Sequence, residues 1–173
     1  MQGLKKNSAR ERKMTNRAFR LREFRNTLGR FATSVTVITA LEDGKTHGMT
    51  ANAFVSVSLE PPLVLVSLDN RSHMHRILRA AGRYGISVLA EGQRALSDHF
   101  AGRTIEDVQV DFVSRAGAAL LEGAVAYFVV QVLDVHSAGD HTLYIGTVEY
   151  FEHRDDRPLL FYAGKYEQLL FAG

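Results

Sequence analysis

The sequence predicts a mainly β protein, an antiparallel barrel with a few short helices. About six or seven segments rich in β-branched residues are typical of strands. Hairpin-like turns join them, whereas a doubly wound sheet would need regular helical crossovers. The chain has 173 residues, of which 46% are hydrophobic and 23% charged. This length and composition indicate one globular domain with a sizeable core.

Residues 1–18 are predicted to be a flexible leader, and residues 19–173 a single domain. The leader carries the basic residues Lys5, Lys6, Arg10, Arg12 and Lys13, and the formal net charge of the whole chain is +2. Without these residues the chain is slightly acidic. A nucleic-acid-binding tail is the alternative, but neither an aromatic nor a glycine-rich binding motif accompanies the charge.

The domain opens with a predicted helix over residues 19–28, where apolar residues recur at helical spacing before Gly29. Residues 32–41 are rich in β-branched side chains and predict a strand. A turn over residues 42–48 leads into the next strand, which extends to residue 59. Pro61 and Pro62 end it because proline cannot donate to a ladder. Residues 63–68 predict a further strand.

The strand over residues 48–59 alternates between apolar and mostly small polar positions. One face is expected to hold Met49, Ala51, Ala53, Val55, Val57 and Leu59, and the other Thr50, Asn52, Phe54, Ser56 and Ser58. This strand contains no charged residue, although Lys, Glu and Arg usually dominate a solvent-facing side. The polar row is therefore either the solvent face of a half-buried sheet or the lining of a site for a flat heteroaromatic ligand.

The rest of the chain continues the β pattern with two more short helices. Ser72 as an N-cap and Gly82 as a stop predict the first helix. A strand over residues 84–90 and a second helix over 93–102 follow, whereas residues 102–122 give no firm assignment. Two long strands over 123–152 flank a turn at 137–140, and 159–162 is the last predicted strand. Arg71 and Ser72 either bind a phosphate at the helix start or belong to a plain capped helix.

Several classes of site are excluded or disfavoured. The absence of cysteine excludes disulfides, thiolate metal sites and cysteine nucleophiles. Glycine-rich phosphate-binding motifs and the serine-hydrolase elbow do not occur. Metal pairs at His136 with His141, or His73 with His75, are less common than solvated histidines, so no metal is expected. The apolar stretches are too short to cross a bilayer, and a cytoplasmic location is the default expectation.

Six segments resemble, in order, those of a known family. They are LGRFATSVTVITA (28–40), HGMTANAFVSVSLEPPLVLVSL (47–68), SVLAEGQRALSDHFAG (87–102), LEGAVAYF (121–128), HSAGDHTLYIGTVE (136–149) and PLLFYAGKY (158–166). Together they resemble the flavin reductase-like family, whose members adopt an FMN-binding split barrel. Members act as the small reductase component of two-component flavin monooxygenases. The resemblance therefore implies an antiparallel split β-barrel, a homodimer and a partner monooxygenase.

The resemblance also implies which residues bind the two ligands. Flavin, as FMN or FAD, would contact Thr50, Asn52, Ala53, Phe54, Val55, Ser56, Ser67, Leu68, Arg71, Ser72 and Ser87. The nicotinamide of NADH or NADPH would lie near His141 and Tyr166. Two positions depart from the family pattern, because Ser34 replaces a usual glycine and Ser87 a frequent asparagine. No catalytic side chain is expected, since hydride passes between the cofactors.

The predicted function is that of an NAD(P)H:flavin oxidoreductase that releases reduced flavin to a separate monooxygenase. The uncharged row of the strand over residues 48–59 would then face a neutral tricyclic ring. Two alternatives stay open at this point. One is a split-barrel flavoprotein that holds its flavin tightly and passes electrons onward, and the other is a non-catalytic flavin-binding module.

Overall fold

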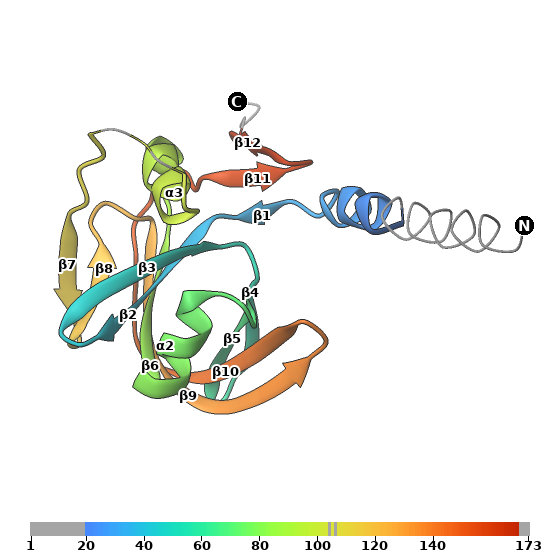
Figure 1. The fold of residues 1–173 in the computed structure, drawn as a ribbon. Coiled ribbons are helices and arrows are strands. Elements are labelled where there is room, and N and C mark those ends of the chain that lie inside the picture. The colour runs from blue at the N-terminus through green and yellow to red at the C-terminus, as the bar shows by residue number, and fades with distance from the viewer. Residues whose placement is uncertain (1–19, 104, 106, 170–173) are drawn as a thin grey trace, which may run out of the picture.

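The computed structural model describes residues 20–103, 105 and 107–169, so the predicted leader lies outside this part of the chain. Residues 20–28 form a helix that leads into the strands (Figure 1). The following elements are β1 (Thr33–Ser34), β2 (Thr36–Glu42), β3 (Lys45–Ala51), β4 (Phe54–Leu59), β5 (Pro62–Asp69), α2 (His73–Ala81), β6 (Arg83–Val88), η1 (Glu91–Gln93), α3 (Arg94–Phe100), β7 (Phe112–Arg115), β8 (Ala118–Leu121), β9 (Ala126–Ala138), β10 (His141–His153), β11 (Leu160–Tyr162) and β12 (Lys165–Glu167).

The strands form one large antiparallel sheet and two small ones. The large sheet has seven strands in the order β3-β2-β6-β9-β10-β5-β4, and it is accompanied by a β1-β11-β12 sheet and a β7-β8 hairpin. Neighbouring strands pair antiparallel throughout the described residues. The predicted mainly β, antiparallel fold class is therefore confirmed.

The order of the large sheet forces it to curl. Its two edge strands, β3 and β4, are consecutive in the chain and are separated only by Asn52 and Ala53. A flat sheet of seven strands would hold its edges about 29 Å apart, at about 4.8 Å per spacing. The connection from Ala51 to Phe54 spans at most about 11 Å. The edges must therefore approach each other, and Figure 1 shows β3 and β4 meeting where the sheet has curved round.

The main core lies inside this curve. Inward-facing side chains of β2, β5, β6, β9 and β10 pack against α2, which lies within the curve of the sheet (Figure 1). The buried members from α2 are Met74, Ile77 and Leu78. Each fully buried aliphatic side chain of this kind contributes about 1.5–3 kcal/mol. Packing thus holds α2, and with it the loop from β5 into α2, against the sheet.

Local sequence signals set the ends of several elements as predicted. The Ser72 hydroxyl accepts a hydrogen bond from the backbone N–H of His75, and Gly82 ends α2 with a positive φ of 66°. The turn predicted over residues 42–48 is shorter in the structure, because β2 extends to Glu42 and β3 begins at Lys45. The hairpin turns at Asp43 and Gly44, both with positive φ, as a two-residue hairpin turn requires. Residues 102–122, for which the sequence predicted no element, contain the β7–β8 hairpin. None of the helices in the described ranges has the length and apolar character needed to cross a membrane.

The predicted single strand over residues 48–59 is wrong, because the chain bends at Asn52 and Ala53. The alternation restarts after the bend. Phe54 packs into the core against Phe128, with ring centroids 5.3 Å apart. Val55 and Leu59, expected on the buried face, are 53% and 90% exposed. Strict alternation requires one unbroken extended strand, so a bend between the sheet edges reverses the faces beyond it.

Replacement of Ser87 by alanine should destabilise the fold. The Ser87 side chain is fully buried, and its hydroxyl accepts the backbone N–H of Leu121 at 2.9 Å. Ser87→Ala leaves that N–H without an acceptor, which costs about 1–3 kcal/mol. Urea unfolding should show this loss, whereas the exposed control Ser137→Ala should stay within about 0.5 kcal/mol of wild type. Equal stabilities for the two variants would contradict the assignment.

Candidate functional site

The candidate site lies at the bend between the two edge strands of the large sheet. Asn52 and Ala53 form this bend, with Asn52 half-buried and Ala53 exposed. The Ala53 carbonyl oxygen accepts the backbone N–H of Ser67 at 3.1 Å. This bond joins the bend to the last residues of β5, so predicted flavin residues from two separate strands come together. Val55 and Ser56 follow on β4 and are exposed.

On one side of the bend, hydroxyl groups attach β3 to α3 and β12. Thr50 donates its hydroxyl hydrogen to the Ser97 carbonyl oxygen at 2.7 Å. The Ser97 hydroxyl in turn hydrogen-bonds the Tyr166 hydroxyl at 2.9 Å. Thr50, predicted to bind flavin, and Tyr166, predicted to lie near nicotinamide, therefore belong to one cluster. Burial raises the pKa of the Tyr166 phenol, which keeps it a donor.

The same cluster contains a carboxylate held by two arginines. Tyr166 donates to Asp98 Oδ1 at 2.7 Å, and Arg103 Nη1 donates to the same oxygen at 2.7 Å. Arg94 lies over the Tyr166 ring, 5.0 Å from its centroid, and its Nε is 3.7 Å from Asp98 Oδ2. Cations stack favourably on aromatic faces. Asp98 thus orients Tyr166 and places two cationic side chains beside it.

On the other side of the bend, Asp69 orients Arg71. Arg71 donates to Asp69 from its backbone N–H at 2.8 Å, from Nε at 3.1 Å and from Nη2 at 2.7 Å. These hydrogen bonds hold the pKa of the Asp69 carboxyl well below its usual range. The Arg71 side chain is nevertheless 86% exposed. Its guanidinium therefore has a set direction while its outer N–H groups remain accessible to an anion.

His141 lies beside this same carboxylate. It is the cross-strand partner of Asp69 in the β5–β10 ladder, and its Nδ1 is 2.7 Å from Asp140 Oδ1. This hydrogen bond lowers the pKa of Asp140. The Asn70 N–H donates to the Asp140 carbonyl oxygen at 3.0 Å. Arg71 and His141, predicted for different ligands, are therefore neighbours, while β10 and β12, which hold His141 and Tyr166, lie well apart (Figure 1).

Some predicted residues take structural positions. The Leu68 side chain is buried in the main core, Phe54 packs against that core, and Ser87 accepts the Leu121 N–H. Ser72 caps α2 with its hydroxyl. Of these residues, Ser87 has no exposed surface at all. These side chains support the bend and the strand ends around it rather than standing free at the surface.

Sequence reasoning missed the residues that orient the predicted ones. Ser97 and Asp98 meet Tyr166 from almost 70 positions away in the chain, and local spacing carries no signal for such contacts. Asp69 could have been found, because a carboxylate two positions before an arginine at a turn can bond both its backbone and its guanidinium.

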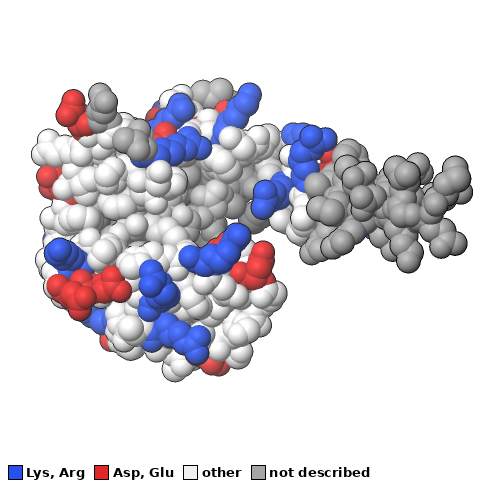
Figure 2. Space-filling view, in the orientation of Figure 1, with Lys and Arg blue, Asp and Glu red and all other residues white. Residues whose placement is uncertain are grey.

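The surface around the bend is largely uncharged and is bordered by cationic groups. Figure 2 shows a white area between the Lys and Arg residues near α3 and those near α2, and Asp and Glu residues lie beside the latter. A flat, neutral ring system with an anionic tail is complementary to such a surface.

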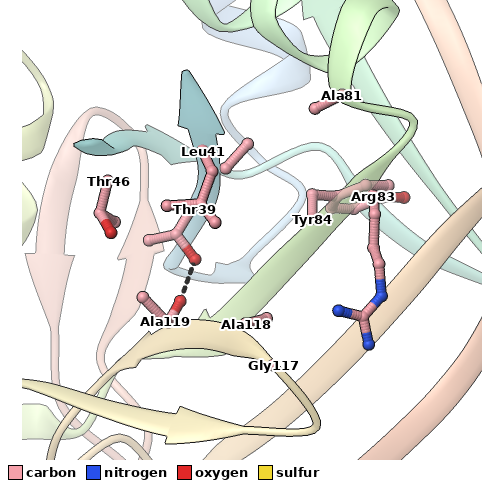
Figure 3. A pocket seen from close by; sticks show the side chains of 10 residues that line it. Thr39, Leu41, Thr46, Ala81, Arg83, Tyr84, Gly117, Ala118 and Ala119 are labelled. Carbon is pink, nitrogen blue, oxygen red and sulfur yellow. Dashed lines mark hydrogen bonds between the residues drawn. The ribbon is translucent and has the colours of Figure 1, made fainter. Parts of the chain in front are cut away.

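The pocket in Figure 3 lies elsewhere, between β2, β6 and β8, and is lined by Thr39, Leu41, Tyr84 and Ala119 among others. None of the predicted ligand residues lines it.

The structure also places the histidines weighed as metal pairs. His136 Nε2 is 2.9 Å from Asp134, while His141 bonds Asp140. His75 Nδ1 bonds the Tyr144 hydroxyl at 2.8 Å, whereas His73 Nε2 lies 2.9 Å from Glu42. Each of these four histidines thus contacts a different partner.

Comparison with known proteins gives a consistent result along almost the whole chain. The profile of the family described as "Flavin reductase like domain" matches residues 28–170. An NADH-dependent flavin reductase of a Rhodococcus species is 49% identical over 152 residues, which are 86% of each chain. The styrene monooxygenase flavin reductase from Pseudomonas putida S12 superposes with a TM-score of 0.81 and 38% identity, covering 86% of this chain and 97% of that one.

A further solved structure contains pieces of two ligands. The NADH:FAD oxidoreductase SgcE6 of Streptomyces globisporus C-1027, in complex with NAD and FAD fragments, superposes with a TM-score of 0.79. It is 36% identical, and the superposition covers 85% of this chain and 91% of that one.

Replacement of Tyr166 by phenylalanine should weaken the attachment of β12 to α3. The variant loses the hydroxyl that donates to Asp98 and contacts Ser97. Hydrogen bonds to charged groups contribute about 1.5–3 kcal/mol, so unfolding free energy should fall by that amount. Tyr162→Phe, at an exposed tyrosine of the neighbouring strand, is the matched control and should change it by less than about 0.5 kcal/mol. A wild-type melting curve for Tyr166→Phe would refute the cluster.

Proposed function

We propose that this chain, which belongs to the flavin reductase-like domain family, is an NADH-dependent flavin reductase. The observation that carries the proposal is the match along nearly the whole domain to a relative of that activity, with 49% identity over 152 residues. In this chemistry the nicotinamide supplies a hydride and the flavin ring accepts it. The protein is left with binding, alignment and exclusion of water.

The residues at the bend fit a flavin. The exposed Ala53, Val55 and Ser56 offer apolar and hydroxyl surface without charge, and Asn52 offers both donors and an acceptor. Arg71, oriented by Asp69, would bind the phosphate together with backbone N–H groups at the start of α2. Thr50 and Ser67 hold the bend against α3 and β5. Phe54, Leu68 and Ser87 would support the flavin site indirectly, because their side chains pack in or against the core.

His141 and Tyr166 remain the proposed contacts of the nicotinamide cofactor, but with different tasks. His141 stands next to the Asp69–Arg71 pair, which suits contact with a charged or polar part of a cofactor. Tyr166, bonded to Asp98 and Ser97, presents a fixed aromatic ring near β3. The role of the chain itself is thus to position the nicotinamide cofactor, with His141 on one side of the bend and Tyr166 on the other.

The proposal includes a partner and an assembly. A relative of 38% identity is named as a styrene monooxygenase flavin reductase, which supports transfer of reduced flavin to a separate monooxygenase.

We further propose a cytoplasmic homodimer. Leu21, Phe24, Leu28 and Phe31 are each more than half exposed on and just after a helix that projects from the sheet. A second copy of the chain would cover this apolar surface.

The first test is an assay of NADH oxidation by the purified chain with and without added flavin. Turnover should rise with free FMN or FAD and saturate, because flavin is bound and released as a substrate. A yellow protein whose turnover ignores added flavin would instead support a tightly held flavin, and flavin binding without NADH oxidation would support a non-catalytic module.

The second test asks whether Arg71 and His141 act together, because both adjoin Asp69. The effects of Arg71→Ala and His141→Ala on kcat/KM for NADH should be non-additive by at least about 0.5 kcal/mol. His136, on the same hairpin but paired with Asp134, gives the control. Arg71→Ala and His136→Ala should add within about 0.3–0.5 kcal/mol. Additive effects of Arg71→Ala and His141→Ala would separate the two residues functionally.

A further inference from the structure

Three potential metal ligands converge outside the candidate flavin site. Glu42 ends β2 and His47 lies on β3, where the ladder pairs Glu42 with Lys45 and Ala40 with His47. This register makes Glu42 and His47 diagonal neighbours on one face of the hairpin. The inward-facing Ala40 shows that this face is the one toward α2. His73, the first residue of α2, completes the group.

The distances suit coordination of one small ion. Glu42 Oε2 lies 2.9 Å from His73 Nε2 and 3.6 Å from His47 Nε2. One ligand atom from each residue lies within 4.8 Å of those of the other two, and no other group of three such residues occurs in the described ranges. Two ligands of one tetrahedral Zn²⁺ lie about 3.3 Å apart. Small side-chain rotations would bring all three atoms to that spacing.

The accessibility of the cluster also suits a bound ion. The side chains of His47, Glu42 and His73 are 35%, 39% and 48% exposed. An ion can therefore enter from solvent, and water can complete its coordination. Two imidazoles and one carboxylate form a ligand set typical of Zn²⁺ with one open position, whereas Mg²⁺ and Ca²⁺ prefer oxygen ligands alone.

We propose that Glu42, His47 and His73 bind a Zn²⁺ ion that fastens the first turn of α2 to the β2–β3 hairpin. The ion replaces the hydrogen bond that now joins Glu42 to His73. Since His73 directly follows Ser72 and Arg71, the ion also restrains the loop that carries the proposed phosphate contact. The site is independent of flavin chemistry, and its test needs no enzymatic activity.

Arg76 opposes this binding in a defined way. Its Nη2 lies 2.6 Å from His73 Nδ1, and a guanidinium can only donate. Nδ1 is therefore the acceptor, and the ring proton is on Nε2, facing Glu42. Coordination through Nε2 moves the proton to Nδ1, so the Arg76 guanidinium must leave. Removal of Arg76 should consequently strengthen Zn²⁺ binding, both by freeing Nδ1 and by removing a nearby positive charge.

The test is a Zn²⁺ titration of the full chain after chelator treatment, in competition with a chromogenic zinc indicator. Wild type should bind one Zn²⁺ per chain. Glu42→Gln and His47→Ala should each weaken binding at least about tenfold, and Arg76→Ala should tighten it severalfold. His136→Ala removes an exposed histidine that also faces a carboxylate, and it should bind as wild type does. Circular dichroism of the metal-free variants checks that each is folded.

A thermal measurement supplies a second readout. At a free Zn²⁺ concentration about a hundredfold above the dissociation constant, wild type should melt about 5 °C or more higher, and His47→Ala should not respond. Absence of Zn²⁺ binding by wild type, wild-type affinity in the Glu42→Gln or His47→Ala variant, or loss of binding in His136→Ala would each overturn the proposal. Unchanged affinity in Arg76→Ala would overturn the assigned tautomer of His73.

Discussion

The two-residue connection between β3 and β4 is the constraint on which the rest of the structure depends. Because Asn52 and Ala53 join strands at opposite edges of a seven-stranded sheet, the sheet cannot stay flat. Its curvature creates the enclosed core and the space that α2 fills. The curvature also brings the two sheet edges together at an exposed bend. Asn52 and Ala53 at this bend belong to neither strand. The candidate site lies at the bend for that reason.

Hydrogen bonds from neighbouring elements then make this bend a rigid surface. Thr50 is attached to α3 through Ser97, and Ala53 to β5 through Ser67. Asp69 fixes the direction of Arg71, and Asp98 that of Tyr166. A reaction between two bound cofactors depends on their alignment, and groups oriented before binding lose less entropy on binding. The carboxylates are thus supports for the residues that meet the ligands.

The start of α2 connects the two sites. Ser72 caps this helix, Arg71 precedes it, and His73 meets Glu42 on the β2–β3 hairpin. Buried Met74, Ile77 and Leu78 hold the helix against the sheet, whereas His73 at its start is joined to the hairpin by exposed polar contacts, which are individually weak in water. A metal ion at Glu42, His47 and His73 would strengthen that attachment, and the loop bearing Arg71 would become more rigid with it.

The sequence by itself determined most of the strands and helices, the caps at Ser72 and Gly82, the uncharged stretch and the family resemblance, because propensity, capping and motifs depend on consecutive residues. Only the tertiary structure decided which side chains meet. It turned Phe54 inward and Val55 outward beyond the bend, and it put His141 beside Asp69 and Tyr166 beside Asp98. It also gathered Glu42, His47 and His73. Such contacts join strands and helices far apart in the chain, and they follow from sheet order and register, which alternation and spacing within one segment do not encode.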